Sequence, residues 1–463
     1  LLRFKDGQIA VHFKGENLSV RSLSYNELYR EVEILASAFR KNGLKKGDRV
    51  VGFLPNIPES IIAMLATASI GAIWSSCSPD FGIKGVLDRF KQINPKFLIS
   101  TNGYRYNGKS FDLTNKLNGI LGDLPSLEQV IIIPFIDDIS KSSIKNGTCN
   151  YDDFIDRNNF DSLVFEQLPF DHPLYIMYSS GTTGLPKSIV HSAGGTLIQH
   201  LKELILHVDL DREDSIFYFT TCGWMMWNWL VSSLAVGSTI VLYEGSPFYP
   251  NSSSLWKLAE ELNITVFGTS AKFIAACQEA KVTPKKNHNL NKMRVILSTG
   301  SPLVEENYDY IYKNVKNDVI LSSISGGTDL ISCFALGNPM LPVYRGEIQC
   351  RGLGMAVESY DINGQFNLNQ KGELVCKIAF PSMPIYFWND ENGDKYHQAY
   401  FSTYPNIWHH GDYILINNHG GIIIYGRSDA TLNPGGVRIG TAEIYRVVDN
   451  FSEVSDSLVV SQD

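Results

Sequence analysis

The sequence lacks any C-x-x-C pair, and its seven cysteines are scattered along 463 residues. An odd number of cysteines without paired spacing does not indicate a disulfide framework, so we expect reduced thiols and a cytosolic localisation. A positive excess of charge is also missing, because 40 basic residues stand against 48 acidic ones for a formal net charge of −8. Nucleic-acid phosphates would be repelled over most of such a surface, and we expect no nucleic-acid partner.

Long apolar runs are missing as well. The longest, residues 61–74, contains Ser and Thr and is shorter than the roughly 20 residues that cross a bilayer. We interpret this run as a buried helix and expect no membrane insertion. No solenoid-type repeat and no long low-complexity linker is present, and the length predicts at least two subdomains.

What is present is an alternation of strand-like and helical segments. One helix is predicted to begin at the capping box S-Y-N-E, Ser24 to Glu27, and to stop at Gly43. Strands are expected at 48–55, 130–135, 173–177, 215–220 and 319–323, with helices after Pro58 and at 197–207, 255–263 and 304–315. This alternation predicts an α/β fold with helix-covered parallel sheets. From Val343 to Thr431, short strands separated by Gly, Pro and Asn predict a smaller, β-barrel-like subdomain.

The segment with the clearest chemistry is Y-S-S-G-T-T-G-L-P-K-S, residues 178–188, directly after a predicted strand. Glycines let backbone N–H groups turn toward an anion, hydroxyls add donors and a lysine adds a cation, so we expect a phosphate-binding loop. The spacing does not match a Walker A loop, and a flexible surface loop is the alternative. The expected phosphate ligands are Ser179, Ser180, Gly181, Thr182, Thr183, Gly184 and Lys187.

This loop closely resembles that of the adenylate-forming superfamily, which comprises acyl-CoA synthetases, luciferases and peptide-synthetase adenylation domains. S-G-G-T-D, residues 325–329, resembles the family motif in which Gly327 and Thr328 would contact phosphate and the acid would hold magnesium. The acid here is Asp329, one methylene shorter than the family's Glu. W-H-H-G-D, residues 408–412, resembles the motif whose acid binds both ribose hydroxyls, which assigns that role to Asp412.

The segment from Gly426 to Ile444 resembles the hinge motif of the superfamily. The resemblance implies that Arg427 reaches ribose or phosphate, that Asp429 is the pivot and that Arg438 meets the phosphates. It also implies an adenylate-forming domain over residues 1–428, incomplete at its N-terminal end, and the start of a truncated C-terminal domain over 429–463.

Among subfamilies the chain resembles the acetoacetyl-CoA synthetases most, through T-C-G-W-M-M-W-N-W at 221–229, F-G-T-S-A-K-F at 267–273 and L-S-T-G-S-P-L at 297–303. Gly300, Ser301 and Pro302 would lie against adenine. Acetyl-CoA synthetases carry Trp where Gly326 stands, and a Trp side chain buries roughly 200 Å², so we expect Gly326 to leave room for acetoacetate. The expected acyl pocket consists of Trp224, Met225, Met226, Asn228, Thr299 and Gly326, although core packing is an equal interpretation for the tryptophans.

The resemblance implies that acetoacetate, ATP with Mg²⁺ and coenzyme A are the small-molecule partners. Lys187, Thr328 and Arg438 are the expected catalytic residues, because a carboxylate that attacks the α-phosphorus of ATP needs its charge neutralised. The family's C-terminal adenylation Lys has no counterpart between Asp429 and Asp463, so we expect slow adenylate formation. Two alternatives stay open: another short- or medium-chain acyl-CoA synthetase, and a non-catalytic nucleotide-binding relative.

Overall fold

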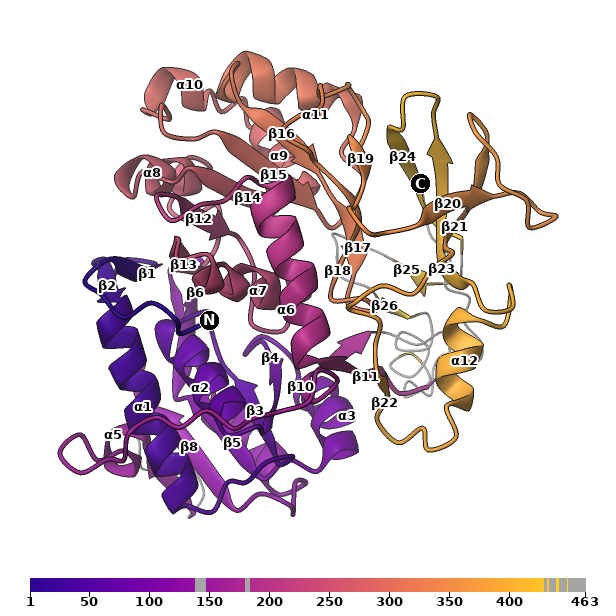
Figure 1. Ribbon diagram of the computed structural model, residues 1–463. Helices are drawn as coiled ribbons and strands as arrows, with labels where there is room; N and C mark the ends of the chain where they lie inside the picture. The colour runs from indigo at the N-terminus through magenta and orange to yellow at the C-terminus, as the bar shows by residue number, and fades with distance from the viewer. Residues whose placement is uncertain (138–146, 180–183, 429–430, 433–438, 441–447, 449–463) are drawn as a thin grey trace.

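The computed structural model describes residues 1–137, 147–179, 184–428, 431–432, 439–440 and 448. Two large β-sheets, of eight and seven strands, dominate the chain, and helices pack on and between them (Figure 1). The predicted α/β class with two helix-covered sheets is therefore confirmed.

The eight-stranded sheet is built largely from the first half of the chain. In spatial order its strands are β22 (Tyr386–Phe387), β11 (Lys187–Ser192), β10 (Pro173–Ser179), β4 (Ile73–Cys77), β3 (Arg49–Phe53), β5 (Phe97–Thr101), β8 (Gln129–Ile133) and β9 (Thr148–Asn150). Neighbours from β10 to β9 are parallel, whereas β11 pairs antiparallel with β10 and β22. The hairpin of β10 and β11 therefore places the predicted phosphate loop at an edge of this sheet.

The seven-stranded sheet carries the second half of the predicted site. Its strands are β16 (Ile320–Ser323), β15 (Val295–Thr299), β14 (Val266–Ser270), β12 (Ser215–Tyr218), β13 (Thr239–Glu244), β1 (Ile9–Gly15) and β2 (Arg21–Ser24). All neighbours from β16 to β1 are parallel, and β2 alone is antiparallel to its neighbour. The carboxyl ends of β15 and β16 lie together, which is where ligands bind in open α/β sheets.

Helices cover both sheets and fill the space between them. They are α1 (Tyr25–Lys41), α2 (Pro58–Ser69), α3 (Ile83–Ile93), α4 (Thr114–Leu121), α5 (Tyr151–Phe154), α6 (Ala193–Lys202), α7 (Met225–Val231), α8 (Ser254–Glu261), α9 (Ala271–Glu279), α10 (Pro284–Asn287), α11 (Glu305–Tyr310) and α12 (Asp394–Tyr400). A π-helical turn, η2 (Glu203–His207), prolongs α6, and η3 (Ser232–Ala235) and η4 (Ile311–Val315) prolong α7 and α11. The predicted capping box of α1 is present, because the Ser24 hydroxyl accepts from the Glu27 amide and the Glu27 carboxylate accepts from the Ser24 amide.

The largest buried cluster joins the two sheets into one body. It includes Phe97 and Ile99 from the eight-stranded sheet, Ile216 and Ile240 from the seven-stranded sheet, and Trp229 from α7. Helices α6 and α7 lie at this junction (Figure 1). Because the junction is packed with apolar side chains, the strand ends that carry the predicted site are held in fixed relative positions.

The short strands after the seven-stranded sheet form small antiparallel sheets. One contains β17 (Ser325–Gly327), β18 (Ser332–Leu336) and β19 (Cys350–Arg351); another contains β20 (Val357–Tyr360), β21 (Lys371–Cys376), β23 (Trp408–Ile416) and β24 (Ile422–Arg427). Two-stranded pairs are made by β6 (Gly103–Tyr106) with β7 (Lys109–Asp112), and by β25 (Thr431–Leu432) with β26 (Ile439–Gly440). Within the described ranges these strands do not close into a barrel, so the antiparallel subdomain is better described as open sheets.

The prediction of one buried helix over residues 61–74 is only partly right. Helix α2 stops at Ser69, Gly71 takes a positive φ of 74°, and the chain then enters β4 at Ile73. The break arises because Gly favours the left-handed backbone at a helix end. An uninterrupted apolar run hid the change, since buried helices and buried parallel strands have the same composition.

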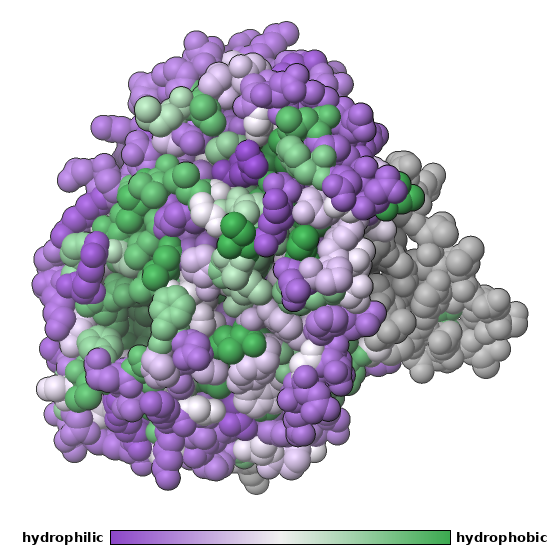
Figure 2. Space-filling model, turned by 45° about the vertical axis from the view of Figure 1, so that its right-hand side comes forward, coloured by the Kyte–Doolittle hydropathy of each residue, from purple (hydrophilic) through white to green (hydrophobic). Residues whose placement is uncertain are grey.

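One face of the molecule shows hydrophilic side chains around its rim and hydrophobic patches between them (Figure 2). Across the described parts of the chain, every helix is too short or too polar to cross a bilayer.

Candidate functional site

The predicted phosphate loop connects β10 to β11. Ser179 pairs with Lys187 in the antiparallel register, so the last residue of one strand faces the first residue of the other. Gly184 has a φ of 102°, a left-handed conformation that side chains rarely adopt, which explains the glycine. Ser180, Gly181, Thr182 and Thr183 lie outside the described residues.

Lys187 meets Asp329, which lies 142 residues further along the chain. Its Nζ is 2.9 Å from Asp329 Oδ1, and the Tyr400 hydroxyl donates to the same oxygen at 2.7 Å. The Asp329 side chain is 2% exposed and that of Lys187 is 27% exposed, so the carboxylate is sealed while the cation still reaches solvent. The Lys187 ammonium also lies 5.2 Å from the Tyr400 ring centroid. The structure therefore brings the predicted phosphate loop, through Lys187, into contact with the S-G-G-T-D motif, through Asp329.

Thr328 is positioned by a buried histidine that sequence reasoning missed. His191 on β11 lies with Nε2 3.0 Å from the Thr328 carbonyl oxygen, which requires Nε2 to carry the proton and donate. Burial lowers the pKa of His191 to about 3, so the imidazole is neutral. The contact fixes β11 to the S-G-G-T-D segment next to Lys187.

The neutral state of His191 predicts an acid-sensitive fold. Because the pKa is about 3 in the folded chain and 6.5 in an ordinary imidazole, the unfolded state binds one more proton between these values, and stability falls as pH falls. Between pH 6.5 and 5 the loss from this group is about 2 kcal/mol. Denaturant unfolding of wild type and His191→Gln at both pH values should show a shallower pH slope in the variant.

His397 provides the matched control for that measurement. It is exposed on α12, so its imidazole meets solvent in the folded and unfolded states alike. His397→Gln should keep the wild-type slope. Equal slopes for wild type and His191→Gln would contradict a neutral, buried His191.

Asp412 and Arg427 face each other across β23 and β24. They are register partners, and Arg427 Nη1 lies 3.1 Å from Asp412 Oδ1. Both side chains are nearly buried, with 10% and 11% exposed. The second Asp412 oxygen is 3.7 Å from His410 Nε2. Asp429 and Arg438, the predicted hinge and phosphate residues, lie outside the described residues.

A row of aromatic contacts links the Lys187 region with Asp412. Tyr400, which binds Asp329, stacks on Trp408 with ring centroids 3.7 Å apart. The rings of Trp408 and His410 stack with centroids 6.4 Å apart, and His410 Nε2 lies 3.7 Å from the Asp412 carboxylate. The phosphate-loop lysine and the predicted ribose anchor are therefore joined by packed side chains, and both border the same part of the molecule.

The predicted adenine segment follows β15 directly. The Thr299 hydroxyl donates to the Ile324 carbonyl at 2.8 Å, and the Ile324 amide donates to the Ser298 carbonyl at 2.8 Å. These two hydrogen bonds hold the segment that precedes S-G-G-T-D beside the segment that precedes Gly300. Gly300 itself has a φ of 93°. Ser301 and Pro302 follow at the surface end of this pair. Adenine and phosphate segments are thus neighbours.

The aromatic and methionine residues of the T-C-G-W-M-M-W-N-W motif divide into predicted acyl-pocket residues and core residues. Met225 and Met226 are buried at the start of the helix, and Trp224 just before it is half-buried. Trp227 and Trp229 are core residues with their own partners: Trp227 donates to Asn56 at 3.1 Å. The core interpretation therefore holds for these two tryptophans, which sequence alone left open.

Glu203 is a further residue that sequence reasoning missed. Its fully buried carboxylate accepts from Trp229 Nε1 at 2.9 Å and from the Ser332 hydroxyl, and Lys202 is 3.5 Å away. Trp229 belongs to α7 and Ser332 to β18, so one buried carboxylate ties these two elements together. Glu203 lies in the π-helical turn η2, where a bulge turns the side chain inward.

Gly326 has a structural reason to be glycine in addition to the one we expected. A Cβ built on Gly326 would lie 2.0 Å from the Ser332 carbonyl oxygen and 2.6 Å from Cys333 Cα. These atoms are backbone of the paired strand β18, which cannot move aside without breaking the pair. The close approach of two strands is a structural reason for the glycine, and the expectation that Gly326 leaves room for acetoacetate stays a prediction.

Comparison with known proteins agrees with this geometry. The profile of the family described as AMP-binding enzyme matches residues 3–379. The chain therefore belongs to the AMP-binding enzyme family, the adenylate-forming superfamily that its motifs indicated.

Within that family the chain is similar to acetoacetyl-CoA synthetases, as expected. The acetoacetyl-CoA synthetase of Danio rerio is 53% identical over the whole chain and 70% of the relative. The acetoacetyl-coenzyme A synthetase of Rhizobium meliloti (strain 1021) is also 53% identical, over the whole chain and 71% of the relative. The solved acetoacetyl-CoA synthetase from Streptomyces lividans superposes with a TM-score of 0.87 at 44% identity, covering 98% of this chain and 69% of that one.

Proposed function

We propose that the chain activates acetoacetate with ATP, forming acetoacetyl-AMP and pyrophosphate, and transfers the acyl group to the thiol of coenzyme A. The observation that supports this most directly is the contact of Lys187 with Asp329, which unites two phosphate-binding motifs. The relatives named acetoacetyl-CoA synthetase match the whole chain and support the choice of acid and thiol.

Different residues of the site would bind the ribose, the adenine and the phosphates of the nucleotide. Asp412 and Arg427 would bind the ribose, because a buried carboxylate can accept from two hydroxyls at once. Gly300, Ser301 and Pro302 would lie against adenine. The phosphates would fall at the mouth of the hairpin between Ser179 and Lys187, together with Gly184, Gly327, Thr328 and Arg438.

Asp329 offers the one carboxylate that a magnesium site of this kind uses, but its side chain is 2% exposed, so Lys187 has to move aside before an ion can reach it. Mg²⁺ commonly keeps several waters and binds through one or two carboxylates and the substrate's phosphates. The described residues contain no group of three or more His, Cys, Asp or Glu side chains that could hold a metal, so phosphate and water would complete the ligand shell. When bound, the ion would neutralise charge on the leaving pyrophosphate.

The first step brings two anions together, and the chain's own cations make this possible. A carboxylate oxygen of acetoacetate attacks the α-phosphorus, and the bond to the pyrophosphate oxygen breaks. Lys187 would move partly away from Asp329 and place its positive charge near the phosphates. The Lys187 side chain is 27% exposed, which permits this movement. In the second step the thiol loses its proton, sulfur bonds to the acyl carbon and AMP leaves with the electrons of the C–O bond.

A single-turnover assay with the protein in excess tests this function even if the first step is slow. Pyrophosphate release is followed with ATP, Mg²⁺ and a panel of acetate, butyrate, acetoacetate and octanoate. We expect the fastest release with acetoacetate. Faster release with another acid would support a different acyl-CoA synthetase, and stabilisation by ATP without pyrophosphate release would support a non-catalytic relative.

The boundary between an adenylate-forming domain at 1–428 and a following domain at 429–463 remains a proposal. Its support is the hinge motif around Asp429, which lies outside the described residues.

A further inference from the structure

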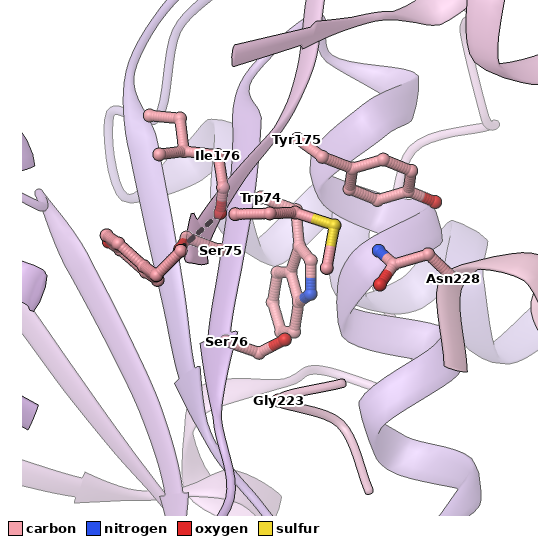
Figure 3. Close-up of a pocket in the computed structure, with 9 residues that line it drawn as sticks. Trp74, Ser75, Ser76, Tyr175, Ile176, Gly223 and Asn228 are labelled. Atoms are coloured by element: carbon pink, nitrogen blue, oxygen red, sulfur yellow. Dashed lines mark hydrogen bonds between the residues drawn. The ribbon is translucent and has the colours of Figure 1, made fainter. Parts of the chain in front are cut away.

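A small cavity lies between the eight-stranded sheet and α7. Its volume is about 10 Å³, which is room for one oxygen-sized group. β4 and β10 contribute most of its wall, and Asn228 closes it from α7 (Figure 3). The lining residues are Trp74, Ser75, Ser76, Tyr175, Ile176, Met177, Tyr178, Gly223 and Asn228.

Three polar side-chain atoms of the lining residues are buried without a hydrogen-bond partner among the described residues: Trp74 Nε1, Asn228 Oδ1 and the Tyr178 hydroxyl. Tyr178 packs against the apolar cluster on the other face of β10, so the pair at the cavity is Trp74 and Asn228, which are 1% and 2% exposed. The indole nitrogen and the amide face each other across the cavity (Figure 3). Ser75 and Ser76 do not compete for the space, because their hydroxyls donate to the carbonyls of Ile176 at 2.7 Å and Cys222 at 2.6 Å. Buried donors and acceptors are almost always paired, so this pair points to a ligand.

Tyr175 determines which ligand suits the pair. Its hydroxyl lies beside the Asn228 amide (Figure 3) and otherwise donates only to Met64 Sδ, a weak acceptor, at 3.4 Å. When the amide turns by 180°, its oxygen accepts from the Tyr175 hydroxyl and its NH₂ group points into the cavity. The amide N–H and the Trp74 N–H then converge on one point. Two convergent donors suit an acceptor without a proton, which describes a carbonyl oxygen.

We propose that Trp74 and Asn228 bind the oxygen on the third carbon of the acyl group and so determine specificity for a 3-oxo acid. This inference rests on the proposed function and deepens it. Asn228 follows Met225 and Met226 on α7, and Tyr178 of the cavity wall directly precedes Ser179 of the phosphate loop. The two elements that enclose the cavity, α7 and β10, are therefore the ones that carry the predicted acyl-pocket methionines and lead into the phosphate loop. A CH₂ group in place of the carbonyl would leave both buried donors unpaired.

The test uses two stable mimics of the acyl-adenylate that differ only at this carbon, so that binding is measured without turnover. They are sulfamoyl-adenosines carrying a 3-oxobutanoyl or a butanoyl group, titrated calorimetrically into the full chain. We expect wild type to prefer the 3-oxo compound by about tenfold or more. Trp74→Phe keeps a six-membered aromatic ring and removes the pyrrole ring with its N–H, so it should lose this preference, and Asn228→Leu should lose it as well.

Trp256→Phe is the matched control. Trp256 is also fully buried and its indole N–H lies beside the weakly accepting Cys277 thiol, but it packs in another core cluster and stacks on Phe267 with centroids 4.8 Å apart. Trp256→Phe should keep the wild-type preference, because Trp256 does not line the cavity. The comparison separates the general effect of losing a buried indole N–H from the effect of losing one at the cavity.

Each outcome bears on one claim. The role of the cavity would be overturned if wild type bound both compounds with equal dissociation constants, or if Trp74→Phe kept the wild-type preference. In either case, tight binding of both compounds would still support the proposed function. Failure of wild type to bind either compound would instead count against the proposed function. If Trp74→Phe does not fold, the wild-type ratio and Asn228→Leu still decide.

Discussion

Lys187→Met is expected to slow pyrophosphate release by about 10²- to 10³-fold, the range found when one preorganised charge-stabilising donor is removed from an active site. The reason is the position of the ammonium group, 2.9 Å from Asp329 at the mouth of the phosphate-loop hairpin. The fold should also be destabilised, because Asp329 is 2% exposed and loses its cationic partner, a cost that the hydrogen bond from the Tyr400 hydroxyl at 2.7 Å offsets only in part. Single-turnover pyrophosphate release and thermal unfolding of the same samples measure the two effects separately.

Two further variants serve as comparisons: one changes the shape of the cation at position 187, and the other removes a surface lysine elsewhere. Lys187→Arg keeps a cation but replaces a point charge by a planar fork, so we expect an intermediate rate. Lys14→Met removes the surface ion pair with Glu261, which is partly exposed on both sides and contributes about 1 kcal/mol or less. It should release pyrophosphate at the wild-type rate. A Lys187→Met protein as fast as wild type would remove Lys187 from phosphate binding.

The parts of the fold that sequence predicts are those with local signals. Ser24, Glu27 and Gly43 mark both ends of α1, because a capping box and a left-handed glycine act within one helical turn. Strand β10 is predicted in the same way, from an apolar run at 173–177 followed by turn residues, whereas its hairpin partner β11 was not predicted. Lys187 and Asp329 were assigned to one site by their motifs, and the structure brings them into contact.

The parts that sequence could not predict depend on contacts between distant segments. His191 and Tyr400 belong to no recognisable pattern, yet they hold Thr328 and Asp329 in place through bonds across 137 and 71 residues. Gly326 was interpreted from its neighbours in the motif, whereas its environment is the backbone of β18. Trp74 is a further example. In the sequence it is one residue of an apolar strand, and only the fold shows that its N–H faces Asn228.

Asp412→Asn is expected to weaken nucleotide binding by about 100-fold, because two hydrogen bonds from ribose hydroxyls to a charged acceptor are weakened at once. It should also lower the free energy of unfolding by about 3 kcal/mol, since Arg427 is nearly buried and keeps its charge when its partner loses one. Calorimetric titration with AMP and denaturant unfolding measure the two consequences on one protein.

The double variant Asp412→Asn with Arg427→Leu distinguishes a ligand-binding carboxylate from a structural one. Removing both charges leaves no uncompensated ion between β23 and β24, so stability should largely return to the wild-type value. Affinity for AMP should not return, because the carboxylate that accepts from the ribose is still missing. A double variant that regains both stability and affinity would show that Asp412 serves only to neutralise Arg427, and the ribose would then need another anchor.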